Sequence, residues 1–316
     1  MLKKNYIHPW QKSPKIIEQN RSLCDPKVTI VMPVFNQESI IQDVLLCLCS
    51  SMGYPFKLII IDDGSDDASQ VIIMKFLKEK FYNFSLFCSY VIIKNKIPIY
   101  ETACDNQGFR YAQTEYIIEC QSDVFINELN FDIKMIKVLE ASGAGTVSGR
   151  LIHPFSLLDN MTSWFRYPFF KFKSLFDRYF QCAGLMGENI FVKNPINFVK
   201  NSYYIGETNA RGPWLLRKSD LMKLNYLDEK NFFLDEADHD YNRRIYENFG
   251  KKAAYVPIEQ TSFFLDGSTR KQRKGVNLKI YNYLKKKKQG SKNYKYFLSK
   301  YHPYSPLKIL KLNNKN

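Results

Sequence analysis

Short apolar runs alternate along residues 28–125 with segments whose apolar residues recur at helical spacing. Four runs have the length and β-branched or aliphatic character of buried strands: Val28–Met32, Leu58–Ile61, Val91–Ile93 and Tyr116–Ile118. The first is expected to stop at Pro33. The segments between the strands predict helices over about 40–48, from an Asp66 or Asp67 cap to about Lys80, and over 104–113. This alternation is typical of βαβ units and predicts an α/β fold, with a mostly parallel central sheet flanked by helices.

Polar residues follow three of the predicted strands. They are Pro33 to Asn36, Asp62 to Ser65, and Gln121 to Asp123. One Asp-Gly-Ser stretch is ordinarily only a turn that caps a helix. Ligands of parallel sheets, however, lie beyond the carboxyl ends of the strands, so three such ends on one edge indicate a binding site. The sequence lacks the glycine-rich dinucleotide motif, the P-loop and the G-x-S-x-G nucleophile elbow.

The charge of the chain is unevenly distributed. There are 46 Lys and Arg against 31 Asp and Glu, a net charge of +15. Residues 270–316 contain 15 of the basic residues and no acidic residue, which leaves the preceding part balanced. A nucleic-acid-binding domain would carry its charge on the folded face, so this distribution argues against one. We therefore expect a polar, irregular N-terminal arm over 1–27, a folded domain over 28–270 and a basic, partly helical tail over 271–316.

The remaining composition predicts a cytoplasmic protein. No apolar stretch reaches the roughly 18 residues that span a bilayer, and the N-terminal residues lack the apolar segment of a secretion signal. The seven cysteines show no zinc-type pairing, so we expect all of them to be reduced thiols.

Several motifs, in this order, resemble family 2 glycosyltransferases with the GT-A (Rossmann-like) fold. They are PVFN (33–36), IIIDDGSDD (59–67), NQGFRYAQTEYI (106–117), QSD (121–123), GPWLLRKS (212–219) and EADHDYNRR (236–244). The resemblance covers about residues 28–270, with a donor half over 28–125 and an acceptor half over 126–270. It implies an inverting transferase of the hexosyltransferase type (EC 2.4). Such an enzyme moves a sugar from a nucleotide-diphospho-sugar, most often a UDP-sugar, to a hydroxyl of a glycan, glycolipid or protein.

The resemblance also implicates individual donor-binding residues. They are Pro33, Phe35, Asn36, Asp62, Asp63, Asn106, Gly108, Gln121 and Arg273. Asp62 is expected to accept from the N–H of a uracil-type ring. Gly108 is expected to let the main chain approach the ligand, and Arg273 to reach the diphosphate.

A divalent cation, Mn²⁺ or Mg²⁺, is implied as the partner of the leaving diphosphate. Asp123 matches the second Asp of the family's D-x-D and is the expected metal ligand. The first Asp is replaced by Gln121, which brings no charge, and the late His of the family is missing. His239 or a water is therefore the candidate to take its place.

An inverting displacement needs a general base for the acceptor hydroxyl. Asp238 is the first candidate and Glu236 and Asp240 are the alternatives. Burial is expected to shift the pKa of the base upward, if at all.

Two segments leave their roles open. An aromatic insert at about 155–205 contains nine aromatic residues within 161–180. It fits a membrane interface, a cover for an acceptor cleft, or a loop packed on its own domain. The basic tail fits anionic lipid, nucleic-acid phosphate or plain solvation. Oligomerisation stays open, and a non-catalytic protein that binds nucleotide-sugars or glycans is the alternative function.

Overall fold

The computed structural model describes residues 14–20, 24–150, 152–153, 202–234, 236–262, 279, 281–286 and 308–311. Arg273 and nearly all of the aromatic insert lie outside the described residues.

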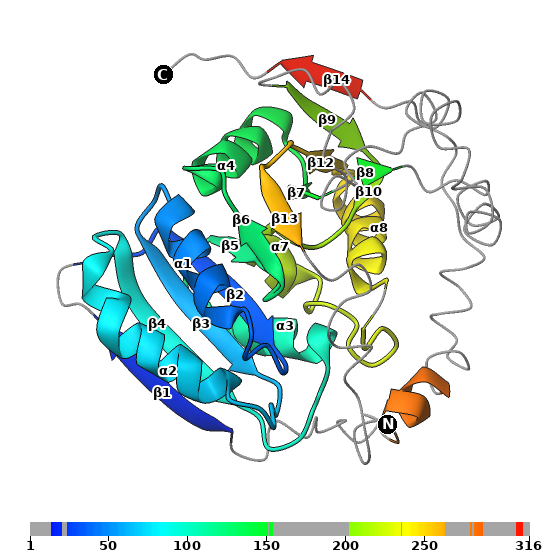
Figure 1. Cartoon of the computed structure of the whole chain (residues 1–316). Coiled ribbons are helices and arrows are strands. Elements are labelled where there is room, and N and C mark those ends of the chain that lie inside the picture. The colour runs from blue at the N-terminus through cyan, green and yellow to red at the C-terminus, as the bar shows by residue number, and fades with distance from the viewer. Residues whose placement is uncertain are drawn as a thin grey trace, which may run out of the picture.

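A ten-stranded sheet forms the centre of the molecule (Figure 1), in the order β1-β4-β3-β2-β5-β11-β7-β12-β9-β14. Its strands are β1 (Lys15–Asn20), β2 (Val28–Val34), β3 (Phe56–Asp62), β4 (Phe87–Lys94), β5 (Tyr116–Glu119), β7 (Thr146–Ser148), β9 (Ser202–Gly206), β11 (Trp214–Arg217), β12 (Ala253–Tyr255) and β14 (Lys308–Lys311). Strands β4, β3, β2 and β5 are parallel, as are β7 and β12. The predicted α/β fold with parallel strands at its centre is therefore confirmed. The antiparallel strands β1, β9 and β14 were not predicted. Strand β11, within the motif GPWLLRKS, pairs antiparallel to β5 and β7.

Helices cover both faces of this sheet. They are α1 (Ile41–Ser51), α2 (Ser69–Lys80), α3 (Glu101–Tyr111), α4 (Phe131–Ser142), α7 (Lys218–Lys223) and α8 (Ala237–Phe249), with a 3-10 turn at Phe81–Asn83. Side chains alternate across the strands. Ile30 and Met32 pack in one core with α1, α2 and α4, whereas Val31 packs in the other with α3, α7 and α8. Two short two-stranded sheets complete the fold, β8 (Ile152–His153) with β10 (Thr208–Asn209) and β6 (Val124–Ile126) with β13 (Gln260–Ser262).

Two local predictions require correction. Strand β2 does not stop at Pro33 but continues to Val34, with Pro33 opposite Ile61 of β3. Pairing of β2 with β5 ends at Val31, so Pro33 lies where the strand has a neighbour on one side only, and a missing N–H is tolerated there. Helix α2 begins at Ser69 after Ala68, and Asp67 accepts a hydrogen bond from the Ser69 amide without occupying the cap position.

The N-terminal arm is not irregular throughout, because Lys15–Asn20 forms the edge strand β1, antiparallel to β4. Just after it, Cys24 is bonded to Cys88 of β4 in a disulfide. The prediction that all seven cysteines are reduced thiols is wrong for this pair. Since disulfides persist mainly in oxidising compartments, this bond also weighs against the cytoplasmic expectation.

Part of the basic tail contacts the folded body. Residues 281–286 are helical, and Tyr281 and Leu284 pack against a small cluster formed by Tyr100, Phe233 and Leu234. The Tyr281 ring meets the Phe233 ring edge-on at 5.7 Å between centroids. None of the helices in the described part of the chain has the length and apolar character that crossing a bilayer requires.

Candidate active site

The carboxyl ends of β2, β3 and β5 lie together at one edge of the sheet, as the sequence predicts. Asp62 ends β3 and is fully buried. Its Oδ1 accepts a hydrogen bond from the Ser65 amide at 2.9 Å, and its Oδ2 lies 3.9 Å from Lys94 Nζ. This carboxylate is therefore held in place by its own turn and by one lysine.

Asp63 has a structural role. One of its oxygens accepts from the Ile99 amide at 2.7 Å and the other from the Tyr100 amide at 2.9 Å. Tyr100 has a positive φ of 74° and directly precedes α3. The two hydrogen bonds therefore fix the entry into that helix, and this role accounts for the buried carboxylate without a ligand.

Asn36 joins the loop after β2 to the loop after β3 through hydrogen bonds. Its side-chain amide donates to Asp66 Oδ1 at 2.6 Å and its Oδ1 accepts from the Asp66 amide at 3.0 Å. The main-chain amide of Asn36 donates to Ser65 Oγ at 3.1 Å. Phe35 is buried beside it and Pro33 is half-buried. These residues lie at the ends of β2 and β3, where the sequence predicts the donor to bind.

Asn106 and Gly108 lie inside α3, and their contacts differ from those expected of donor-binding residues. The Asn106 side chain is fully buried, accepts from the Leu227 amide and donates to the Leu227 carbonyl, both at 2.9 Å. It also donates to Glu229 Oε2 at 2.6 Å. Asn106 thus joins α3 to the segment before α8.

Gly108 faces the sheet. A Cβ at this position would lie 3.0 Å from Ile61 Cδ1 and would overlap Val31 Cγ1 still more closely. Real Cβ atoms do not come this close to other heavy atoms. Glycine is therefore required here for α3 to pack on β2 and β3. This packing gives Gly108 a structural reason, and its predicted approach to a ligand stays a prediction.

Gln121 and Asp123 lie between β5 and β6. The Gln121 side-chain amide donates to Glu101 Oε1 at 3.2 Å, and both Gln121 and Asp123 are half-buried. In the part of the chain that the structure describes, no three His, Cys, Asp or Glu side chains are grouped so that they could hold a metal ion. Asp123 and His239 therefore do not belong to a common group of three such side chains.

Asp238 lies in the first turn of α8, close to Glu236, the residue with positive φ (66°) that precedes the helix. Only 7% of Asp238 is exposed. Its Oδ2 accepts from the Arg211 amide at 3.1 Å and its Oδ1 from the His239 amide at 2.9 Å. Each oxygen of this carboxylate is thus oriented by one main-chain donor.

The charge state of Asp238 differs from the expectation. Burial alone would raise the pKa of Asp238, but the charges of His239 and Arg211 and the two amide hydrogen bonds outweigh burial and lower it. The prediction of an upward shift was wrong, because the sequence did not show that Arg211 lies beside this carboxylate. Asp238 is ionised at neutral pH.

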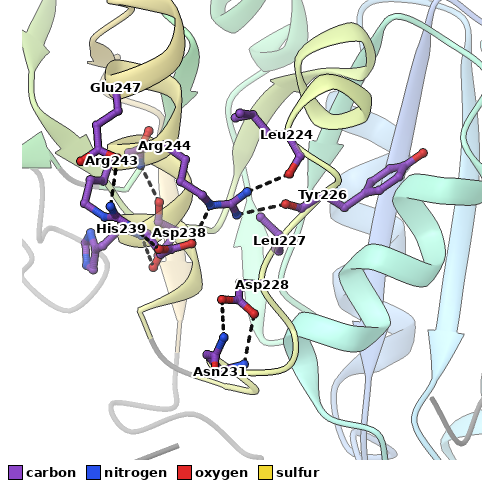
Figure 2. Close-up of polar contacts among 12 residues, drawn as sticks. Leu224, Tyr226, Leu227, Asp228, Asn231, Asp238, His239, Arg243, Arg244 and Glu247 are labelled. Carbon is purple, nitrogen blue, oxygen red and sulfur yellow. Dashed lines mark hydrogen bonds and ion pairs between the residues drawn. The ribbon is translucent and has the colours of Figure 1, made fainter. Parts of the chain in front are cut away.

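The other acidic candidates on α8 differ from Asp238. Asp240 accepts from Arg243 Nη2 at 2.7 Å and from Arg244 Nε at 2.8 Å. Figure 2 shows Arg244 extending from α8 to the carbonyls of Leu224 and Tyr226, at 2.9 and 3.0 Å. Asp240 therefore anchors α8 through its arginines and is a poor candidate for a base. Glu236 is half-buried.

His239 is held by Thr208 of β10, with 2.8 Å between its Nδ1 and the Thr208 hydroxyl oxygen. That contact orients the ring toward β10.

The sequence analysis missed a buried network around Arg211, whose side chain is 4% exposed. The guanidinium donates to Asp105 Oδ2 at 2.5 Å and to the Leu234 carbonyl at 2.9 Å, and it lies 3.5 Å from Glu101 Oε1. Asp105 immediately precedes Asn106, but 106 positions separate it from its partner. No local pattern reveals such a pair.

Two carboxyls of this network have pKa values raised by burial. The pKa of Asp105 rises to about 8 because burial outweighs the opposing effect of Arg211. The pKa of Glu119, at the end of β5, is raised well above its ordinary range, again chiefly by burial. Neither carboxylate oxygen of Glu119 has a hydrogen-bond partner among the described residues. Burial is thus the main cause of the raised pKa values in this network.

Comparison with known proteins places this arrangement in context. A model of the family described as "Glycosyl transferase family 2" matches residues 29–197, more than half of the chain. Over 113 residues the chain is 37% identical to an uncharacterized glycosyltransferase of Haemophilus influenzae (strain ATCC 51907 / DSM 11121 / KW20 / Rd). The match covers 34% of this chain and 42% of that relative, so less than half of the relative's length is matched.

Two solved structures are similar in fold. One is residues 1–349 of S. aureus TarS in complex with UDP-GlcNAc, with a TM-score of 0.50, 12% identity, and coverage of 84% of this chain and 67% of that chain. The other is the mannosyltransferase PcManGT from Pyrobaculum calidifontis in complex with GDP-Man and Mn²⁺, with a TM-score of 0.51, 14% identity, and coverage of 83% and 64%. At these identities the likeness shows the fold alone, which is that of the GT-A glycosyltransferases.

Proposed function

Because the chain belongs to glycosyl transferase family 2, we propose that it is an inverting transferase with Asp238 as its general base. It would move a sugar from a nucleotide-diphospho-sugar to an acceptor hydroxyl. The observation that supports this assignment most is the position of Asp238, which is almost buried at the start of α8 with each oxygen oriented by one amide.

The chemistry of Asp238 fits this role. A base must be deprotonated before the acceptor arrives, and the lowered pKa of Asp238 keeps it so at neutral pH. Each carboxylate oxygen accepts one main-chain hydrogen bond, which leaves lone pairs for the acceptor hydroxyl. Asp238 would take the hydroxyl proton as the oxygen attacks the anomeric carbon from the face opposite the leaving diphosphate. Asp240 lacks this freedom because two arginines engage it.

On the donor side we propose a UDP-sugar. Asp62 would bind its nucleobase, with Phe35 and Asn36 in the adjacent loop. Two fold neighbours support a nucleotide-sugar, since one was solved with UDP-GlcNAc and the other with GDP-Man and Mn²⁺. The donor panel described below distinguishes uridine from guanosine and identifies the sugar.

We propose Asp123 as the protein ligand of a divalent cation. Mg²⁺ and similar ions are often held by one or two carboxylates together with substrate phosphates. Asp123 is half-buried, and one carboxylate fits an ion that binds together with the donor. Gln121 cannot supply a second carboxylate because its side chain is an amide, and this amide donates to Glu101. Such an ion supplies positive charge to the leaving diphosphate.

The decisive experiment combines a donor panel with one substitution. Purified protein is mixed with UDP- and GDP-sugars, with Mn²⁺ or EDTA, and nucleoside diphosphate release is measured alongside donor binding by calorimetry. Asp238→Asn should leave donor binding intact and lower turnover by about 100-fold or more. Glu247→Gln is the matched control, since Glu247 is also an α8 carboxylate but is paired with Arg243 at the other end of the helix.

A second function would give a different result. If donors bind but neither the wild type nor any variant turns them over, the chain is a non-catalytic nucleotide-sugar-binding protein. The replacement of the first D-x-D carboxylate by Gln121 favours that alternative. Near-normal turnover in Asp238→Asn would instead refute the assignment of the base.

A further inference from the structure

Arg211 connects three parts of the candidate site. Its main-chain amide donates to Asp238 Oδ2 at 3.1 Å. Its guanidinium donates to Asp105 of α3 at 2.5 Å and to the Leu234 carbonyl, shortly before the base in the sequence, at 2.9 Å. One residue therefore both orients the base and fixes the segment that leads to it.

The connection extends to the donor edge of the sheet. Glu101, in the first turn of α3, lies 3.5 Å from Arg211 Nη1 and accepts from the Gln121 amide at 3.2 Å. Both contacts use Glu101 Oε1. An aspartate in place of Gln121 would set two carboxylates against each other here, which gives Gln at this position a physical reason.

The burial of Arg211 indicates a specific role. An almost completely buried guanidinium has a large desolvation cost, and apolar residues of similar size often fill such a position with no loss of stability. What an apolar side chain cannot provide is a set of directed hydrogen bonds to α3 and to the Leu234 carbonyl at once. This geometry fixes the direction of the Arg211 amide and, with it, the orientation of the Asp238 carboxylate.

We propose that Arg211 is a positioning residue for Asp238, held in place by Asp105, Glu101 and the Leu234 carbonyl. The inference rests on the proposed function, since it assigns Arg211 a role in the same transfer reaction. Arg211 touches neither donor nor acceptor in this scheme and acts through Asp238 alone.

The test separates kcat from donor binding. Arg211→Met should lower kcat per donor-binding site by about 10- to 100-fold, the cost expected for a misplaced catalytic group. The dissociation constant for UDP with Mn²⁺ should stay within about twofold of wild type, because the substitution leaves the donor-side residues in place. Arg211→Lys should recover part of the loss, because the lysine cation still reaches Asp105. Counting sites by calorimetry excludes a loss that reflects misfolded protein alone.

Stability is controlled by two further variants. Arg211→Met leaves Asp105 without its partner, so Asp105→Asn/Arg211→Met is made in parallel to remove the unpaired carboxyl. Arg217→Met is the matched control, since Arg217 also forms an ion pair, with Glu140 of α4, and none of its contacts within the described part of the chain involves Asp238. It should keep wild-type kcat.

A double-mutant cycle with Asp238→Glu gives a readout that a purely structural role would not produce. If Arg211 acts through Asp238, Arg211→Met should cost much less in the Asp238→Glu background than in the wild type. Equal losses in both backgrounds, or a wild-type kcat in Arg211→Met, would overturn the inference. Absence of turnover in the wild type would instead refute the proposed function, so the two failures are distinguishable.

Discussion

Gly108 offers a sharp test of how α3 sits on the sheet. In Gly108→Ala the new Cβ would collide with Val31 and lie 3.0 Å from Ile61 Cδ1. Both partners are fully buried in central strands that have neighbours on each side, so neither can yield. Overpacking of this kind costs about 1–3 kcal/mol, and the tight contact favours the upper end. The better helix propensity of alanine offsets about 1 kcal/mol, so we expect a net loss of about 2 kcal/mol.

Val31→Ala provides the matched variant. Alone it removes two buried methyl groups and should cost about 2 kcal/mol. Those methyl groups include the atoms that collide with the added Cβ, since Val31 Cγ1 and Cγ2 are both within its reach. The double variant should then lose only about 1 kcal/mol, which is about 3 kcal/mol less than the sum of the single losses.

Urea unfolding followed by tryptophan fluorescence measures these values, and calorimetry with UDP and Mn²⁺ measures donor affinity in the same proteins. If Gly108→Ala is stabilising, or if the two substitutions are additive, the helix is not seated as described. If Gly108→Ala weakens donor binding and Val31→Ala does not restore it, the original expectation of a ligand-contacting glycine regains support.

Three further predictions concern stability. Asn106→Ala should lower the free energy of unfolding by about 1–3 kcal/mol in urea titrations, because it leaves the buried Leu227 amide and carbonyl without partners, and an unchanged midpoint would contradict this. Asp105 has a pKa of about 8 in the fold against an ordinary 3.8, so its contribution is present below about pH 4 and lost as the pH rises to about 8. Wild-type stability should therefore fall relative to Asp105→Asn across that window, and a constant difference would exclude the shift. Denatured protein prepared without reductant should titrate five thiols, since two of the seven cysteines form the Cys24–Cys88 bond. Reduction of this bond should lower the free energy of unfolding by about 2–4 kcal/mol. A titration of seven thiols would show that the bond does not form.

The sequence predicted those parts of the fold that depend on local pattern. The buried strands β2, β3, β4 and β5 were located because each is a continuous apolar run between turn residues. Strand β1 was missed because its residues, KIIEQN, are largely polar and it pairs along one edge only. The extension of β2 through Pro33 was missed because proline is tolerated there only where β2 has one neighbouring strand. The pairing of strands in the sheet decides this, and the local sequence does not show it.

The position of the polar strand ends could be predicted from the sequence, whereas the contacts of each residue could not. The polar strand ends do meet at one edge, and Asp238 lies buried at the start of α8. Asp63, Asn106 and Gly108, by contrast, make contacts within the protein. Motifs mark such residues without showing whether a ligand or the fold requires them. That distinction depends on which distant segments come into contact, as with Arg211 and Asp105.

The two outermost strands of the central sheet come from the two terminal segments of the chain, β1 at one edge and β14 at the other. Each covers an inner neighbour, β4 or β9, whose main-chain groups would otherwise be open to pairing with another molecule. Removing either segment would therefore expose an aggregation-prone edge without touching the proposed base, Asp238. Shortened versions of the protein should fail through self-association, and a fusion partner or tag is best attached outside Lys15 and Lys311.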